Sequence, residues 1–456
     1  MDDVIRRHLL SINTIVATAV AQLNDSSDED GEENETTINS IDHRVLARSK
    51  RTKLQHSEAL HCINHDYLGP TPVFNGKEFD QMFRISRRRY EIICQEIVKL
   101  DTEFYNSGTD CIGRESSSIQ CKILLPLKCL AFGVPPHAFR DYFQMSKTLA
   151  HQLYTLFMKY LYKAFKQEYL RLPTKNDVKQ ILQLHEEVHG IKGMMGSLDC
   201  MHVPWKNCPK AYQAAFQGKL KKPTIILEAA CDFNLWFWHA SFGFPGAMND
   251  LNVLNLSPLL DSFLDGTFAA LEQDFIPFTI GSSFFFFLFF LVDGIYPCYS
   301  RFLATISEPV LDDEKIYAMW QECTRKDIEC GFGVLQSKFQ VIARPILAMN
   351  GDVITNLVAA CVILHNMGVQ DRVCGVDSSY YSPADGIGTS AFEPTDITVP
   401  EVERTSAAAT DHNATIGVTE GPQTISAGMI QRWQDLVNED ENARLLQAVI
   451  KHVNNK

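Results

Sequence analysis

The sequence predicts a mixed α/β domain that follows an all-helical domain. From about Phe79 to His189, apolar residues recur every three or four positions, which is typical of amphipathic helices. After Gly193 the pattern changes to short runs rich in β-branched and aromatic residues, bounded by Gly, Pro and Asn. These runs alternate with helical segments, and that order favours a sheet layered with helices over a helical bundle.

Three of the short runs predict successive strands: GSLDCMHV, TIILEAACDF and LWFWHASFG. The last two are expected to form a hairpin at Phe233-Asn234. A helix should begin at Asn249 or Asp250, because PGAMND supplies a turn and a cap. The run FFFFLFFLV has the length of one buried strand, and helical patterns follow over residues 312–340 and 352–365.

The net charge of −13 is concentrated in two segments. Residues 25–35 hold seven acids and no base, and residues 368–420 hold nine acids and two arginines. Such segments favour solvated, disordered chain around a body that is near neutral. We therefore expect a disordered leader over 1–68, a helical domain over 69–189, a mixed α/β domain over 190–367, a disordered linker over 368–427 and a C-terminal helix over 428–456.

The cysteines and the most apolar run bear on the kind of protein. Thirteen cysteines lie mostly within apolar runs and form no CxxC pair, which favours reduced thiols and an intracellular protein. The run of residues 284–292 is far shorter than the roughly 20 apolar residues of a membrane span. We expect a soluble protein without a membrane partner.

The helical region raises two alternatives of equal weight. Residues 137–143 and 147–165 predict two helices about a tight turn, with Ser146 as N-cap of the second. This pattern is typical of a helix-turn-helix that binds DNA, and equally of a plain helical bundle. Arg87 and Arg88, in RISRRRY, are candidate phosphate contacts beside it.

Four acids stand at or near the ends of predicted elements: Asp199, Asp250, Asp293 and Glu329. Carboxylates are the ligands that Mg²⁺ and Mn²⁺ prefer, and two such ions suit phosphodiester cleavage because they activate the nucleophile and neutralise the phosphate. Cys200, His202 and Cys208 make a weaker case for zinc, because no fourth ligand is nearby.

Each acid also has an ordinary structural interpretation, except one. Asp250 is equally well a helix cap, Asp293 stands in an Asp-Gly turn, and Glu329 pairs with Arg325 four residues earlier. Asp199 lies in the middle of an apolar strand, where a carboxylate is costly without a partner.

The chain resembles transposases of the PIF/Harbinger class, the plant and oomycete type with a DDE endonuclease domain, over roughly residues 74–367. The similar segments are GMMGSLDCMHVPWKNCP, GKLKKPTIILEAACDFNLWFWHASFGFPGAMNDLNVLNLSPL, LVDGIYP, RKDIECGFGVLQSKFQVIARP and ACVILHNM. The resemblance implies a ribonuclease-H-like fold in which Asp199, Asp293 and Glu329 are catalytic and all four acids bind Mg²⁺ or Mn²⁺.

The resemblance further implies a nuclear transposase that acts on DNA at terminal repeats and a target site. A Myb-like DNA-binding helper protein and a homo-oligomer are expected with it. Lys219, Lys221 and Lys222 join Arg87 and Arg88 as candidate DNA contacts. The alternative is a host-adopted relative that binds DNA or protein without cleavage.

Two departures from the family's pattern stand near the site. Residues 275–292 read FIPFTIGSSFFFFLFFLV where the family has a polar strand, and we hypothesise that part of this segment is translated intron, because pyrimidine-rich splice tracts encode phenylalanine. Cys330-Gly331 follows Glu329 where the family has a pair such as Arg-Ala, and glycine weakens a helix by about 1 kcal/mol.

Overall fold

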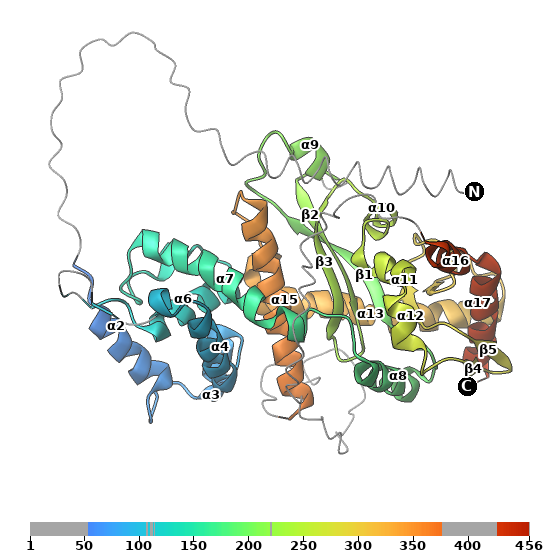
Figure 1. The fold of residues 1–456 in the computed structure, drawn as a ribbon, viewed down its shortest axis with the longest axis horizontal. Coiled ribbons are helices and arrows are strands. Elements are labelled where there is room, and N and C mark those ends of the chain that lie inside the picture. Colours follow the sequence, from blue (N-terminus) through green and yellow to red (C-terminus); the bar gives the residue numbers. More distant parts are fainter. Residues whose placement is uncertain are drawn as a thin grey trace, which may run out of the picture.

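The computed structural model describes residues 53–105, 108–109, 113, 115–218, 221–375 and 426–455. Its centre is a five-stranded sheet in the order β3-β2-β1-β6-β7, with helices on both faces (Figure 1). β1, β2 and β3 pair antiparallel, whereas β1–β6 and β6–β7 are parallel. The expected mixed α/β sheet is therefore confirmed. The strands are β1 (Met194–Pro204), β2 (Thr224–Cys231), β3 (Phe237–Pro245), β6 (Phe289–Val292) and β7 (Phe302–Ala304).

The helices divide between the two faces of the sheet. One hydrophobic core includes side chains of β2, α13 and α15, and the other includes side chains of β6, α8, α11 and α17. In the order of the chain the helices of this region are α8 (Lys175–His189), α9 (Gln213–Phe216), α10 (Asp250–Leu254), α11 (Pro258–Asp265), α12 (Thr267–Glu272), α13 (Asp312–Lys338), α14 (Gln340–Ala343) and α15 (Gly351–Val373).

Two glycines allow close backbone approach at the sheet. Gly196, in a bulge of β1, has a φ of +139°, and a Cβ there would lie 2.2 Å from the carbonyl oxygen of Cys231. Gly331 lies on the buried side of α13, where a Cβ would meet the Phe237 ring at 3.3 Å. Although glycine weakens the helix, Gly331 therefore lets α13 pack closely on β2 and β3.

The N-terminal helices share the core of the sheet region. α7 (Lys147–Tyr169) packs along α15, and both contribute to one continuous cluster. Asn366 of α15 donates from Nδ2 to the carbonyl oxygens of Tyr169 and Phe237, at 2.9 Å each. Arg89 forms a buried ion pair with Asp371 at 2.8 Å. The other helices here are α3 (Gly76–Phe83), α4 (Arg87–Leu100), α5 (Thr102–Tyr105) and α6 (Ile119–Phe132).

The predicted pair of helices over residues 137–165 is only half present. Ser146 caps α7 by accepting a hydrogen bond from the Leu149 amide at 3.2 Å, as expected. The first helix is wrong: residues 136–139 form one 3-10 turn, η2 (Pro136–Phe139), and residues 140–144 continue as turns that end at Gln144, whose φ is +48°. A two-helix DNA-binding unit is therefore not formed at this place.

Residues 56–68, expected to be disordered leader, are helical instead. α2 (His56–Ile63) and η1 (Asn64–Leu68) bury Ile63 and Tyr67. The Tyr67 ring contacts Phe74 and Phe83 with centroids 5.1 and 5.2 Å apart, so aromatic packing holds this segment against the body. Residues 1–52 lie outside the described residues.

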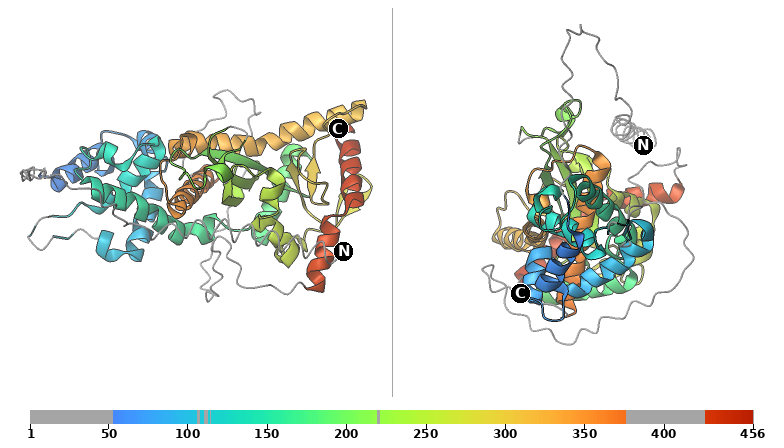
Figure 2. Two further views of the ribbon diagram at one scale, coloured as in Figure 1. Left: turned by 90° about the horizontal axis from the view of Figure 1, so that it is seen from above. Right: turned by 90° about the vertical axis from the view of Figure 1, so that its left-hand side faces the viewer.

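The C-terminal segment forms two helices where one was expected, α16 (Ala427–Leu436) and α17 (Glu439–Asn454). Asn438 separates the two helices, because its side chain caps α17 by accepting hydrogen bonds from the amides of Asp440 and Glu441. Asn442 then donates to the carbonyl oxygens of Tyr299 and Phe302, so α17 is fixed beside β7. Figure 2 shows these helices at the end of the molecule opposite the N-terminal helices. The expected linker loses residues 368–373 to α15, and residues 376–425 lie outside the described residues.

The phenylalanine-rich run does not form one strand. Its first part belongs to a separate hairpin of β4 (Phe278–Ile280) and β5 (Ser283–Phe285), and its last part is β6. Phe284 and Phe286 are 57% and 62% exposed, whereas Phe285 is fully buried. All four residues of β6 are buried, and the strand that leads to Asp293 lies between β1, with which it pairs across the bulge at Gly196, and β7.

One described helix, α15, is long and apolar enough to span a membrane by length and composition alone, and 67% of that window is buried inside the protein. Burial of this kind is ordinary for a core helix. The cysteines of the described residues are all unpaired.

The β4–β5 hairpin predicts that substitutions at adjacent phenylalanines change the free energy of unfolding by very different amounts. Phe284→Ser and Phe286→Ser should each change the free energy of unfolding by less than about 0.5 kcal/mol, because their rings are exposed. Phe285→Ala should lower it by about 3–5 kcal/mol, because it removes a buried ring that also packs under Arg444. Denaturant unfolding of the three variants measures the difference, and equal losses would contradict this packing.

Candidate metal centre

Asp199 lies within β1 and its side chain is 20% exposed, on the face that α13 covers. Its Oδ1 accepts a hydrogen bond from the Cys200 amide at 2.8 Å, and its Oδ2 accepts from Nη1 of Arg325 at 2.9 Å. Burial raises the pKa of this carboxyl, and the charges of Asp250 and Asp293 raise it further, against the lowering effect of the two donors. Two of the other predicted acids, Asp250 and Asp293, are therefore close enough to Asp199 to act on its charge.

Asp293 follows directly on β6, as the sequence predicts. Because Leu291 pairs with Ser197 in the parallel ladder, the end of β6 lies beside Asp199. The Asp293 Oδ1 accepts from the Gly294 amide at 2.7 Å, so the side chain also serves in an Asp-Gly turn. The turn fixes this carboxylate where the strand leaves the sheet.

Asp250 is the first residue of α10, and it is not the cap of that helix. Asn249 is the N-cap, because its Oδ1 accepts from the Asn252 amide at 2.9 Å. The capping interpretation of Asp250 is therefore wrong. The charge of Asp250 acts on Asp199 and on Cys200, which places it beside β1.

Glu329 lies on α13 and its side chain is 49% exposed. Its Oε1 accepts from Nη2 of Arg325 at 2.8 Å, the ordinary pair that the spacing predicts. The same guanidinium also donates to Asp199, so Arg325 connects Glu329 of α13 to Asp199 of β1. Arg325 thus joins Glu329 to the other acids, and sequence spacing alone revealed only half of this contact.

Among the described residues, no group of three or more His, Cys, Asp and Glu side chains is arranged to hold a metal ion. The donor types nevertheless suit a hard divalent cation, because all four predicted ligands are carboxylates. Arg325 supplies positive charge between Asp199 and Glu329 in this arrangement. Binding by both of these acids would require that guanidinium to move.

A buried polar cluster on the opposite face of the sheet was not predicted. Glu228 of β2 is fully buried; its Oε2 lies 2.8 Å from Nε2 of His239 and accepts from the Ser257 hydroxyl. Ser257 also caps α11, so the cluster ties the α10–α11 segment, and with it Asp250, to the sheet. An acid inside the apolar run TIILEAACDF is the same signal that singled out Asp199.

Cys200 and Tyr296 lie next to this cluster. Cys200 pairs with Glu228 across the β1–β2 ladder, and its Sγ is 3.6 Å from the Tyr296 hydroxyl. Burial raises the pKa of both groups, and the charges of Glu228 and Asp250 raise them further. Neutral side chains therefore line the back of the centre, and Tyr296 anchors the turn that begins at Asp293.

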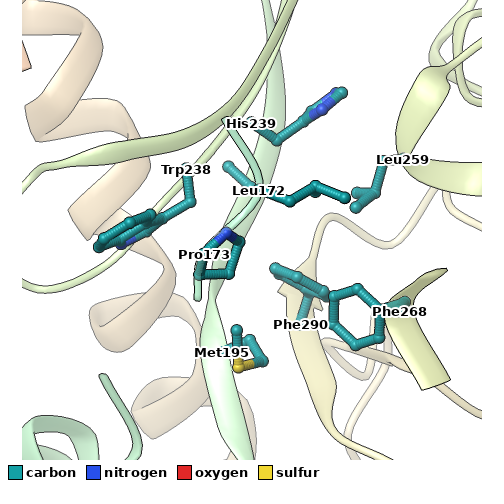
Figure 3. A pocket seen from close by; sticks show the side chains of 9 residues that line it. Leu172, Pro173, Met195, Trp238, His239, Leu259, Phe268 and Phe290 are labelled. Atoms are coloured by element: carbon teal, nitrogen blue, oxygen red, sulfur yellow. The ribbon is translucent and has the colours of Figure 1, made fainter. Parts of the chain in front are cut away.

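A small pocket lies beside His239 (Figure 3). Its lining is otherwise apolar and includes Trp238, Leu259 and Phe290. None of the four acids lines it, so it is not part of the candidate centre.

The candidate DNA contacts differ in their surroundings. Arg87 is half-buried, donates to the Phe74 carbonyl oxygen at 2.7 Å and lies over the Phe79 ring, so its own domain engages it. Arg88, Lys221 and Lys222 are exposed. Lys219 lies outside the described residues.

Asp232 follows directly on β2, and it shows that a carboxyl with a raised pKa need not belong to the candidate metal centre. Burial raises its pKa to about 6, although hydrogen bonds from the Trp238 indole and the Trp236 amide oppose the shift. These contacts fix the turn between β2 and β3, and no predicted ligand is among its neighbours. Its role is structural.

Replacing Asp232 by Asn should therefore change how stability depends on pH. Because the pKa of the Asp232 carboxyl is higher in the folded protein than in the unfolded chain, its protonated form stabilises the fold. That contribution to stability is fully present below the unfolded pKa and is lost as the pH rises through about 6. The variant lacks this loss, so its stability relative to wild type should improve by up to about 3 kcal/mol between pH 4 and pH 7. Denaturant unfolding at both pH values measures the change. Asp141→Asn, which replaces an exposed carboxyl, is the control and should show no such pH dependence. A difference between Asp232→Asn and wild type that does not depend on pH would contradict the raised pKa.

Fold and acids together define the class: a mixed α/β domain with Asp199 on its central strand and Asp293 directly after the neighbouring strand. Residues 167–374, which contain all four acids, match the family model described as "Plant transposon protein". This region is therefore a Harbinger-class, transposase-derived domain of the DDE nuclease type, and the resemblance found in the sequence is confirmed.

Curated relatives agree with this assignment. The human protein "Putative nuclease HARBI1" is 25% identical over 208 residues, which is 44% of this chain and 54% of that protein. The Arabidopsis thaliana "Protein ALP1-like" is 24% identical over 184 residues, 40% of this chain and 44% of that protein. The chain spans about half the length of the curated relatives it matches. No solved structure matches.

Proposed function

We propose that this protein is a divalent-metal-dependent DNA endonuclease of the transposase type, which cleaves phosphodiesters at transposon ends and transfers the strand to target DNA. The observation that carries the proposal is geometric: Asp293 follows β6, which pairs with β1 beside Asp199, and Arg325 joins Asp199 to Glu329. The similarity to proteins named as nucleases supports the same chemistry.

The order of the strands supports a ribonuclease-H-like fold as the scaffold. In that fold the first acid lies on the first strand, the second follows the fourth strand and the third lies on a later helix. Here Asp199 is on β1, Asp293 follows β6, the fourth strand of the main sheet, and Glu329 is on α13. The sheet order with its parallel half is compatible with this fold.

Each acid has a distinct part in the proposal. Asp199 on β1 and Asp293 directly after β6 would bind Mg²⁺ or Mn²⁺ from the sheet. Glu329 would bind it from α13, and Asp250 would be a fourth ligand. Bound divalent ions would supply an activated oxygen nucleophile and neutralise the charge on the phosphate. After cleavage, the exposed 3′-hydroxyl of one DNA end would attack the target strand.

The remaining residues would position the DNA. Arg88, Lys221 and Lys222 are exposed and would contact phosphates, which makes binding dependent on salt. We further propose that the protein acts in the nucleus, as a homo-oligomer and with a Myb-like DNA-binding helper. No pair of helices arranged for major-groove contact is formed over residues 136–165, which is compatible with a helper of this kind.

Removal of the central acids should abolish cleavage and spare binding. Asp199→Asn and Glu329→Gln should each reduce nicking of supercoiled plasmid in Mn²⁺ by at least about 100-fold, because each removes a ligand charge. DNA affinity, measured by fluorescence anisotropy, should stay within about twofold or rise slightly, because a negative charge is lost.

The matched control is Glu322→Gln, an exposed acid nearly two turns earlier on the same helix, which should cleave like wild type. Undiminished nicking by Asp199→Asn would refute the assignment of the centre. Binding without nicking by the wild-type protein would favour the alternative of a host-adopted binding module.

A further inference from the structure

Arg325 contacts two of the four acids of the candidate centre. Its side chain is 15% exposed, and its two terminal nitrogens donate to different acids: Nη1 to Asp199 at 2.9 Å and Nη2 to Glu329 at 2.8 Å. One acid lies on the sheet and the other on the helix. The guanidinium therefore occupies the region between two side chains that are proposed to bind metal.

The helix that carries Arg325 is firmly attached to the sheet. One turn earlier, Gln321 donates from Nε2 to the carbonyl oxygens of Val292 and Leu303, at 2.9 and 3.1 Å. Thr324 and Ile328, on either side of Arg325, are buried. Rotation of the Arg325 side chain can therefore release the acids without displacement of α13.

The chemistry of the guanidinium indicates what could take it away from the acids. Arginine binds carboxylates and phosphates through the same fork of N–H donors, so a DNA phosphate can replace the two carboxylates as acceptor. Glu329 is half-exposed, so its half of the bridge is open to solvent and to a competing anion. Two cations drawn to the same carboxylates repel each other, so divalent metal and Arg325 compete for them.

We propose that Arg325 is a positioning residue that couples metal binding to DNA binding. It holds Asp199 and Glu329 while DNA is absent, and transfers to a backbone phosphate when DNA is bound, which frees both carboxylates for the metal. The inference rests on the proposed function. By thermodynamic linkage, DNA must then tighten metal binding by the same factor as metal tightens DNA binding.

The test measures Mn²⁺ affinity of the full chain by the electron paramagnetic resonance signal of free Mn²⁺, with and without a short DNA duplex. In wild type, the duplex should tighten Mn²⁺ binding by about fivefold or more. In Arg325→Gln, Mn²⁺ should bind about fivefold or more tightly without DNA, because no internal cation competes, and the duplex should add little. Lys326→Gln, which removes an exposed charge one residue away, should behave like wild type.

A second variant guards against a failure of Arg325→Gln to fold, which circular dichroism would reveal. Arg325→Lys keeps the charge but lacks the fork, so it should bind one acid at a time and give intermediate values. If Mn²⁺ binds Arg325→Gln no more tightly than wild type, or the effect of the duplex is unchanged, the coupling role is overturned.

Asp199→Asn separates this inference from the proposed function. If Asp199→Asn loses Mn²⁺ binding while Arg325→Gln matches wild type, the metal centre stands and only the role of Arg325 fails. If Asp199→Asn and wild type bind Mn²⁺ alike, or neither binds it with or without DNA, the proposed centre fails and the inference fails with it.

Discussion

The packing of α13 across the sheet is the contact on which the candidate centre depends. Gly331 allows this helix to lie against Phe237, and Gln321 fixes it to the carbonyl oxygens of β6 and β7. Between these two points the helix presents Arg325 and Glu329 to Asp199. A helix held further away would leave Asp199 as a half-buried carboxylate without a cationic partner, which is costly in an apolar strand. The same glycine that weakens α13 locally is thus what brings its charged side chains to the sheet.

The opposite face of the sheet supplies the second constraint. Glu228 is fully buried, and its contacts with His239 and Ser257 attach the segment that contains Asp250. Tyr296, beside Cys200, attaches the turn that begins at Asp293. Polar groups on the far side of β1 and β2 therefore attach the segments that contain Asp250 and Asp293 to the strand that contains Asp199.

The helical region and the sheet region share one hydrophobic cluster rather than standing as two bodies. α7 packs along α15, and the Asn366 amide joins both to β3. The charged pair Arg89–Asp371 is buried in the same contact and adds specificity to it. An N-terminal region fixed in this way presents its exposed basic residues in a constant position relative to the sheet, which suits the proposed recognition of a DNA backbone.

The sequence by itself determined the mixed sheet, its first three strands and the cap at Ser146, because these depend on local periodicity and turn residues. It also predicted four acids as a metal site, of which Asp199 alone stood out by the cost of a charge in an apolar strand. It could not determine how the phenylalanine run divides, since a uniform apolar run has no periodicity, nor that residues 56–68 pack as helices. Only the tertiary structure decided that Arg325 binds Asp199 as well as Glu329, because the contact joins residues 126 positions apart. Spacing along one helix reveals a neighbour four residues away, whereas a partner on another element is fixed only by the packing of helix on sheet.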